Sequence, residues 1–220
     1  MTPVPGPLAR VAELMSTFRP RWYLCGGWAV DAWLGRQTRD HGDIDVTVFE
    51  GDQRRIFDHL AGWHLIADDA SVDHGTAWNG RRLTLPAHIH CAAPESGFIE
   101  ADLATGIARA QDGFNLEVVF NERSRAGRWV LSREPLLRMP LRRAVRQSPW
   151  GLPTVVPEVL LFFKATAYFG IEEQMTGGRF QDEPDFLALL AHLTEEQRHW
   201  LRESIALLHP GHPWLSQLSP

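Results

Sequence analysis

Cysteine is scarce in this chain: there are only two among 220 residues. Cys25 lies in a short apolar segment and Cys91 follows two alternate histidines. So few cysteines exclude a disulfide-stabilised scaffold and are typical of a protein from a reducing compartment. We expect both to be buried small apolar side chains rather than reactive groups.

Long apolar runs and a targeting signal are absent as well. The longest apolar stretch, 155–163, is interrupted by Pro157 and Glu158, whereas a membrane span needs ~20 apolar residues. The first six residues lack a basic region followed by an apolar run, the pattern of a secretory signal. We therefore expect a cytoplasmic protein with no membrane partner.

Positive charge is not in excess, since the formal net charge is −5. Without a basic field the chain is not expected to bind nucleic acid, while a cationic small molecule is tolerated as a partner. With 44% hydrophobic and 22% charged residues, the composition is that of an ordinary globular protein.

The first 150 residues predict a small mixed sheet with helices. Helical spacing marks a first helix ending before Pro20, and alternation of apolar residues marks strands. Expected elements are a strand over 22–25, the turn Gly26-Gly27, a helix over 28–34, and strands over 43–49, 63–66 and 114–120. A strand over 129–131 is expected to pair with 114–120 across the turn 123–127.

Helices are expected after residue 150. Pro157 stands at a first helical position, Asp182 with Asp185 resembles a capping arrangement, and Thr194 with Gln197 forms a capping box. The prediction is an α+β protein: a mixed β-sheet flanked by helices (1–150), followed by a C-terminal helical bundle (151–220).

Asp43 and Asp45 stand at alternate positions of the predicted strand 43–49. Their side chains then project from one face, roughly 6.5 to 7 Å apart, close enough to hold divalent cations. An isolated Asp-x-Asp is more often a solvated strand face.

The upstream turn Gly26-Gly27 favours the metal interpretation. A glycine pair between a strand and a helix exposes N–H groups at the positive helix end, where phosphate binds. By itself it is also an ordinary tight turn, and it lacks both the Walker pattern and Gly-x-Gly-x-x-Gly.

Residues 25–46, which contain the glycine pair, Asp31, the arginines and both aspartates in order, resemble the signature of the nucleotidyltransferase superfamily. In particular they resemble the branch of small antibiotic nucleotidyltransferases that adenylylate aminoglycosides and lincosamides. The resemblance implies a nucleotidyltransferase-type sheet, ATP as donor, and a hydroxyl-bearing acceptor of small size. It also implies Mg²⁺, as two ions, held by Asp43 and Asp45.

The same resemblance implies a third carboxylate at Glu117, which completes the metal site or accepts the acceptor's proton. Glu122 is its rival. The resemblance also implies that Gly26, Gly27 and Lys164 contact the nucleotide phosphates. Without the resemblance, Lys164 would be interpreted as a surface lysine. Arg39, beside the aspartates, has a guanidinium suited to phosphate, as does Arg36.

Two further patterns stay open. A polycationic acceptor would suit a pocket lined by acidic residues, for which the candidates are Asp31, Asp40, Glu122, Glu172, Glu173 and Asp185. His88 and His90 alternate on a possible strand, but a closed zinc site needs four ligands and no complementary Cys/His cluster exists elsewhere, so we predict no metal there.

Two other functions remain possible from the sequence. One is an adenylyltransferase acting on a protein hydroxyl, of the toxin–antitoxin type. The other is an inactive nucleotide-binding protein, against which the intact Asp43, Asp45 and glycine pair argue. The sequence predicts no oligomeric state and does not identify the acceptor.

Overall fold

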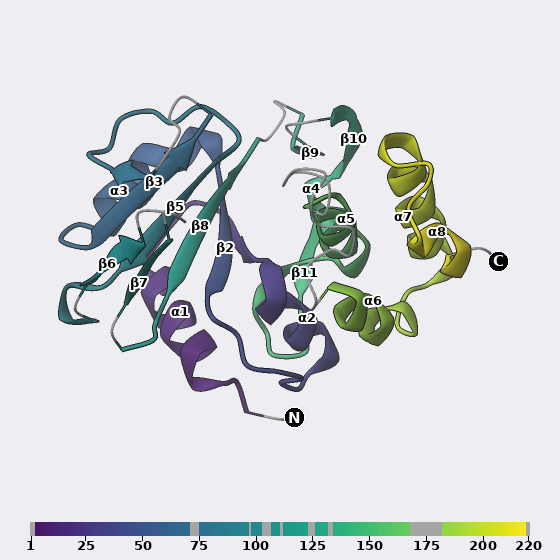
Figure 1. The fold of residues 1–220 in the computed structure, drawn as a ribbon, viewed down its shortest axis with the longest axis horizontal. Helices are drawn as coiled ribbons and strands as arrows, with labels where there is room; N and C mark the ends of the chain where they lie inside the picture. Colours follow the sequence, from purple (N-terminus) through teal and green to yellow (C-terminus); the bar gives the residue numbers. More distant parts are fainter. Residues whose placement is uncertain are drawn as a thin grey trace.

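The computed structural model describes residues 3–70, 75–96, 98–102, 107–110, 112–122, 126–131, 134–167 and 182–218. Its centre is a mixed eight-stranded sheet in the order β11-β12-β1-β2-β8-β5-β3-β4 (Figure 1). These strands are β1 (Trp22–Leu24), β2 (Ile44–Phe49), β3 (His64–Asp69), β4 (Thr76–Ala77), β5 (Ala87–Ala92), β8 (Leu116–Asn121), β11 (Val145–Gln147) and β12 (Pro153–Val155). Two short sheets pair β6 (Phe98–Asp102) with β7 (Ile107–Ala110), and β9 (Arg128–Leu131) with β10 (Glu134–Pro140).

Helices pack on this sheet and extend beyond it at the C-terminal end, where α7 and α8 form one side of the molecule (Figure 1). Among the described residues they are α1 (Gly6–Ser16), α2 (Gly26–Leu34), α3 (Gln53–His59), α4 (Leu141–Ala144), α5 (Pro157–Ala167), α6 (Asp182–Leu190), α7 (Glu195–Leu208) and α8 (Trp214–Gln217). The α+β class, with a mixed sheet followed by C-terminal helices, is confirmed.

The two faces of the sheet differ in polarity because successive strand residues point to opposite sides. On one face Val46, Val118 and Ile89 are fully buried. Helix α3 covers this face, since the Phe57 ring contacts Trp78, which in turn contacts Phe120 of β8. The alternate residues of β2, β8 and β5 lie on the other face, and they include the polar side chains that matter below.

Several local predictions are confirmed. The predicted strand and helix are β1 followed by α2, and β2 is the next strand, but α2 begins at Gly26, so the glycine pair forms its first two residues rather than a separate turn. Helix α5 begins at Pro157. Thr194 and Gln197 form both hydrogen bonds of a capping box, at 3.3 and 2.9 Å, because the threonine hydroxyl and the glutamine amide oxygen accept from opposite backbone N–H groups.

The predicted pairing of 129–131 with 114–120 is wrong. Strand β8 lies between β2 and β5 and uses both of its edges. It has no edge left for β9, which pairs instead with the following β10. The prediction failed because β5 comes from the stretch before residue 111, where the hydrophobic pattern is weak.

The division of the chain at residue 150 stays a prediction. Strand β12 follows that position and pairs in parallel with β1 of the main sheet. Buried residues on both sides of residue 150, such as Val46, Val159 and Phe162, belong to one hydrophobic cluster. We propose that 151–220 folds onto the first unit rather than apart from it, which limited proteolysis tests directly.

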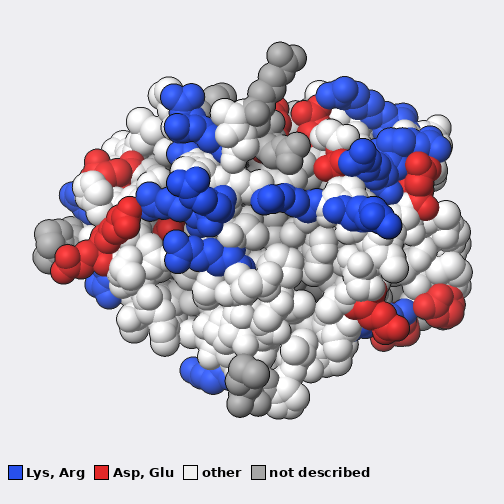
Figure 2. Space-filling view, turned by 180° about the vertical axis from the view of Figure 1, so that it is seen from behind, with Lys and Arg blue, Asp and Glu red and all other residues white. Residues whose placement is uncertain are grey.

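The charge is unevenly spread despite the net value of −5. Figure 2 shows basic side chains gathered in a band across the upper part of the face behind that of Figure 1, and nearly all of them are arginines because the chain has one lysine, Lys164. The expectation that nucleic acid is not a partner therefore stays a prediction. Among the described residues, no helix has the length and apolar character required to cross a membrane.

Candidate active site

Three carboxylates at the start of two adjacent central strands come together on the polar face. Asp43 immediately precedes β2 and Asp45 is its second residue. Strand β2 runs parallel to β8, with Asp45 directly opposite Glu117. One oxygen from each of the three carboxylates lies within 4.8 Å of the others. Asp43 is exposed, and Asp45 and Glu117 are partly exposed, so the group is accessible to solutes.

The carboxylate of Asp45 lies against Gly26, the first residue of α2. Gly26 has a φ of +64°, and a Cβ added there would stand 1.7 Å from Asp45 Oδ2. The Cys25 N–H donates to the Asp45 backbone oxygen at 2.9 Å, which fixes the two segments together. Only glycine fits this position, because any side chain would displace the aspartate.

Gly27 is covered by the loop that precedes β2. A Cβ at Gly27 would stand 2.5 Å from His41 Nδ1 and 2.6 Å from a terminal nitrogen of Arg39. The predicted phosphate-binding turn and Arg39 are thus next to each other, at the positive end of α2. Sequence spacing alone did not show how closely these groups approach.

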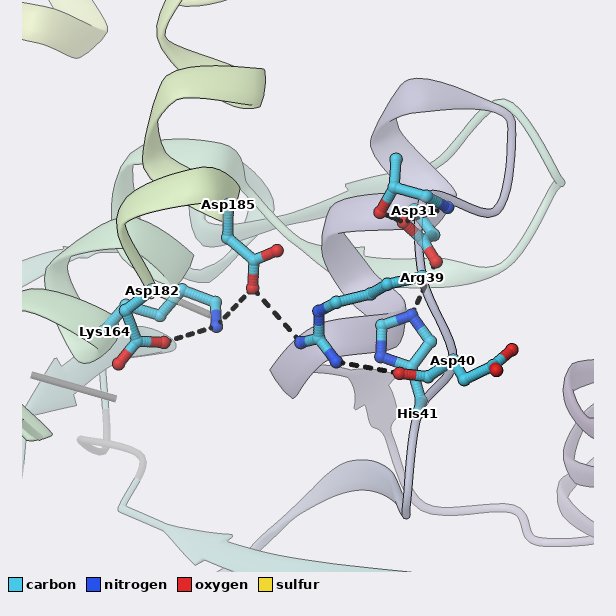
Figure 3. Close-up of polar contacts among 8 residues, drawn as sticks. Asp31, Arg39, Asp40, His41, Lys164, Asp182 and Asp185 are labelled. Atoms are coloured by element: carbon cyan, nitrogen blue, oxygen red, sulfur yellow. Dashed lines mark hydrogen bonds and ion pairs between the residues drawn. The ribbon is translucent and has the colours of Figure 1, made fainter. Parts of the chain in front are cut away.

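Asp31 holds that loop in place from inside helix α2 (Figure 3). It is fully buried, and its carboxylate accepts hydrogen bonds from the Thr38 N–H at 3.1 Å and from the Thr38 hydroxyl. Its other oxygen lies 2.5 Å from His41 Nε2. The expectation that Asp31 lines an acceptor pocket is therefore wrong, because no part of it reaches the surface.

Lys164 and Arg39 meet at Asp185 (Figure 3). Lys164 Nζ lies 2.9 Å from Asp182 Oδ1 and 2.7 Å from Asp185 Oδ2, and Arg39 lies 3.3 Å from that same Asp185 oxygen. The Lys164 side chain is only 10% exposed, so the alternative of a surface lysine is wrong. The carboxylates of Asp182 and Asp185 both form ion pairs with this lysine. Asp185 is also buried, so it does not line an open acceptor pocket.

Glu122 stands apart from the carboxylate group. It follows the last residue of β8, and its backbone N–H donates to Asn121 Oδ1 at 2.9 Å. Of the two candidate third carboxylates, the structure brings Glu117 beside Asp43 and Asp45. Glu172 and Glu173, proposed for the acceptor pocket, lie outside the described residues.

A second polar group continues along the same face. His90 of β5 is directly opposite Glu117, and His88 of β5 is directly opposite Asp68 of β3. Burial lowers the pKa of both histidines, while the Asp68 carboxylate acts in the opposite direction. Sequence analysis noted the two histidines but missed Asp68, because nothing in the sequence shows that β3 pairs with β5.

The Cys25 thiol, which lies beside Asp45, is not expected to be reactive. Burial first, and then the negative charge of Asp45, raise the pKa of the Cys25 thiol well above its ordinary value. Its sulfur accepts a hydrogen bond from the Thr47 hydroxyl at 3.2 Å. A neutral thiol is a poor nucleophile, which agrees with the expected lack of reactivity, but Cys25 is partly exposed whereas Cys91 is buried as expected.

The donor set of the carboxylate group suits Mg²⁺. Three carboxylates so close together repel one another unless a cation neutralises them. Oxygen donors are the ligands that Mg²⁺ prefers, and it binds through one or two carboxylates together with substrate phosphates. The Gly26-Gly27 helix end and Arg39 lie on the side from which phosphates would complete such a site.

Solved structures of antibiotic-modifying enzymes share this fold. The lincosamide antibiotic adenylyltransferase LnuA with lincomycin bound has a TM-score of 0.54 and 14% identity, covering 88% of this chain and 100% of its own. The antibiotic-resistance factor ANT(2'')-Ia in solution has a TM-score of 0.58 and 14% identity, covering 94% and 95%. Its complex with adenylyl-2''-tobramycin has a TM-score of 0.52 and 16% identity. At such identities the likeness concerns the fold.

Sequence comparison gives a shorter but closer match. Proteins from Escherichia coli and Klebsiella pneumoniae named 2''-aminoglycoside nucleotidyltransferase are 60% identical over 35 residues, which is 16% of this chain and 19% of theirs. The chain thus matches about a fifth of the length of these curated relatives. A family model described as aminoglycoside-2''-adenylyltransferase matches residues 7–123, which include all three carboxylates, and the chain belongs to this family.

Proposed function

We propose that the protein transfers AMP from ATP, with Mg²⁺, to a hydroxyl group of an aminoglycoside antibiotic and releases pyrophosphate. The observation that carries this proposal is the grouping of Asp43, Asp45 and Glu117 within 4.8 Å of one another. Family membership supports the same reaction. A cytoplasmic location, where ATP is available, is part of the proposal.

The reaction forms a bond between the acceptor oxygen and the α-phosphorus and breaks the bond to the pyrophosphate oxygen. When bound, two Mg²⁺ ions would neutralise charge on the attacking and leaving oxygens. Asp43 and Asp45 would hold these ions, with Glu117 as the third ligand or the group that takes the acceptor's proton. For proton transfer, Glu117 has to lie within hydrogen-bonding reach of the bound hydroxyl.

The nucleotide phosphates bind between the Gly26-Gly27 pair and the two cationic side chains of Arg39 and Lys164. Gly26 and Gly27 offer backbone N–H groups at the start of α2. Arg39 and Lys164 already point toward one shared position, which Asp185 occupies. Asp185 thereby holds both cations in place, and a phosphate oxygen arriving beside them gains charge-assisted hydrogen bonds.

An aminoglycoside is favoured over a lincosamide as acceptor. The matched family is described by its action on aminoglycosides, and the curated relatives are named for the same substrate class. A chain with a net charge of −5 tolerates a polycationic acceptor. The lincosamide enzyme enters the comparison through fold alone.

The test incubates the full chain with Mg²⁺, each of the four ribonucleoside triphosphates in turn, and panels of aminoglycosides and lincosamides. Intact-mass analysis of the antibiotics then reads the product. The expected result is an aminoglycoside heavier by one adenylyl group (AMP minus water), formed with release of pyrophosphate and absent when Mg²⁺ is chelated. Asp58→Asn, which changes an exposed carboxylate of α3 outside the carboxylate group, should keep this activity.

Other outcomes distinguish the alternatives. Modified lincosamide without modified aminoglycoside would overturn the acceptor class but keep the reaction. Labelled AMP transferred to protein from a lysate, and to neither antibiotic class, would point to a protein adenylyltransferase. No pyrophosphate with any acceptor would favour an inactive nucleotide-binding protein.

A further inference from the structure

Asp68, His88 and His90 form a group of side chains that the proposed transfer reaction does not use. Asp68 comes from β3, and the two histidines stand at alternate positions of β5. Each offers one potential ligand atom, and these atoms lie within 4.8 Å of one another. All three side chains are partly exposed, at 29%, 37% and 15%, so an ion can enter from solvent.

The spacing of the ligand atoms fits a tetrahedral ion. Asp68 Oδ2 lies 3.3 Å from His88 Nε2 and 3.6 Å from His90 Nε2. Zinc binds imidazole nitrogen and carboxylate oxygen at about 2.0–2.2 Å, which places neighbouring ligand atoms of a tetrahedron about 3.4 Å apart. The two separations from Asp68 are close to this value, and all three ligand atoms lie within 4.8 Å of one another.

Glu117 stands beside this group as well. Its carboxylate oxygens lie 3.8 Å from His88 Nε2 and 3.9 Å from His90 Nδ1. Glu117 therefore borders the group of Asp68, His88 and His90, while its own close carboxylate neighbours are Asp43 and Asp45.

From this geometry we propose that Asp68, His88 and His90 bind one transition-metal ion of the zinc class. Two imidazoles and a carboxylate select Zn²⁺ or Co²⁺ over Mg²⁺, which prefers oxygen alone. The protein then has two neighbouring metal sites with different donors, and Glu117 lies between them. The three-oxygen group takes Mg²⁺, and the two-nitrogen, one-oxygen group takes the softer ion.

No metal is predicted here from the sequence, because a closed zinc site needs four ligands and no complementary Cys/His cluster exists elsewhere in the chain. The additional donors are carboxylates on the neighbouring strands β3 and β8. Strand pairing places them on the same face as the histidines, although Asp68 and Glu117 are far apart in the chain. The positions of Cys and His in the sequence therefore do not identify the group of Asp68, His88 and His90.

Metal binding is measured on the full chain after removal of bound ions by chelation, with no nucleotide or acceptor present. Zn²⁺ titration by calorimetry and Co²⁺ titration by visible absorption report the stoichiometry and the geometry. We expect one tightly bound ion with the intense absorption of tetrahedral Co²⁺. The double variant His88→Asn/His90→Asn loses this ion, while His199→Asn, an exposed histidine of α7, keeps it. Asp45→Asn also keeps it, because Asp45 is not a ligand.

A measurement on the unaltered chain covers the case in which the double variant does not fold. Diethyl pyrocarbonate modifies accessible neutral histidines, and peptide mass analysis locates the modified residues. We expect Zn²⁺, but not Mg²⁺, to protect His88 and His90 while His199 reacts equally in both. Equal modification of His88 with and without Zn²⁺, or unchanged Zn²⁺ binding by a folded double variant, would overturn the proposal. Neither readout needs turnover, so failure here leaves the transferase proposal intact.

Discussion

Arg39 and Lys164 contact the same oxygen of Asp185, at 3.3 and 2.7 Å, although they lie far apart in the sequence. One belongs to the loop before β2 and the other to α5, so Asp185 of α6 joins the C-terminal helices to the edge of the candidate site (Figure 3). The two cations are held in place before any nucleotide binds. A side chain that is already ordered loses less entropy on binding a phosphate.

Removing Lys164 should destabilise the protein much more than removing Arg39. The carboxylates of Asp182 and Asp185 are each only 4% exposed, and Lys164 contacts both. Lys164→Met leaves them without this cation and should cost about 3 kcal/mol of unfolding free energy. Arg39 is 28% exposed and leaves Asp185 with Lys164, so Arg39→Met should cost under about 1 kcal/mol. Urea unfolding measures both, and equal losses would contradict the asymmetry.

Arg39 should affect ATP binding more than its neighbour Arg36. Arg39 lies over the glycine turn at the start of α2, whereas Arg36 is exposed on the same loop. Arg39→Met should raise the KM for ATP about tenfold with little change in kcat, because a charge-assisted hydrogen bond contributes about 1.5–3 kcal/mol. Arg36→Met is the matched control. Steady-state kinetics with varied ATP measure both KM values. A larger rise in KM for Arg36→Met would show that Arg39 is the wrong arginine for the phosphate contact.

Gly26→Ala should lower activity about 100-fold through Asp45. Gly26 and Gly113 both have positive φ, at +64° and +74°, so alanine costs about 1–2 kcal/mol of backbone strain at either position. Only at Gly26 does the new Cβ meet the Asp45 carboxylate, since a Cβ at Gly113 has nothing within 4 Å. Displacing a catalytic group by ~1 Å lowers a rate about 100-fold. The two variants should therefore have similar stability, but only Gly26→Ala should lose activity. Equal activities would show that the contact between this Cβ and Asp45 is unimportant.

His212 should make the fold less stable at acidic pH. Burial, and then His209, lower the pKa of His212 from its ordinary 6.5 to about 4, and its Nδ1 accepts a hydrogen bond from the Trp214 N–H at 3.1 Å. The folded state favours neutral His212, so its contribution is complete above pH 6.5 and is lost as the pH falls toward 4. The loss amounts to about 3 kcal/mol.

His212→Asn keeps an acceptor near Nδ1 but removes the titration. Unfolding free energies of this variant should decline less between pH 7 and pH 4 than those of the wild type. His192→Asn, at an exposed position, should follow the wild-type curve. Parallel curves for His212→Asn and wild type would place the acid sensitivity elsewhere.

Local signals in the sequence predicted those parts of the fold that depend on near neighbours. The glycine pair at the start of α2, the strand with Asp45 and the capping box at Thr194 are all specified within a few residues. Glu117 was found through family resemblance, and the parallel register of β2 with β8 explains why it stands beside Asp45.

Long-range pairing was beyond the sequence. Strand β9 was assigned to the wrong partner because both edges of β8 are used by strands that the pattern did not order. Asp31 was expected at a pocket, yet its hydrogen bonds to Thr38 and His41 turn it into the interior. Asp68 was missed because only the pairing of β3 with β5 brings it to the histidines.

The most direct test of the central claim compares four carboxylate variants under single-turnover conditions with ATP, Mg²⁺ and the accepted antibiotic. Asp43→Asn, Asp45→Asn and Glu117→Gln should each lower the rate of AMP transfer by about 1000-fold, since metal-held charge contributes several kcal/mol to such a step. Glu122→Gln, outside the carboxylate group, should stay within a few-fold of the wild-type rate. A fully active Asp45→Asn protein, or a Glu122→Gln protein as impaired as Glu117→Gln, would contradict the assignment of these three carboxylates to the reaction.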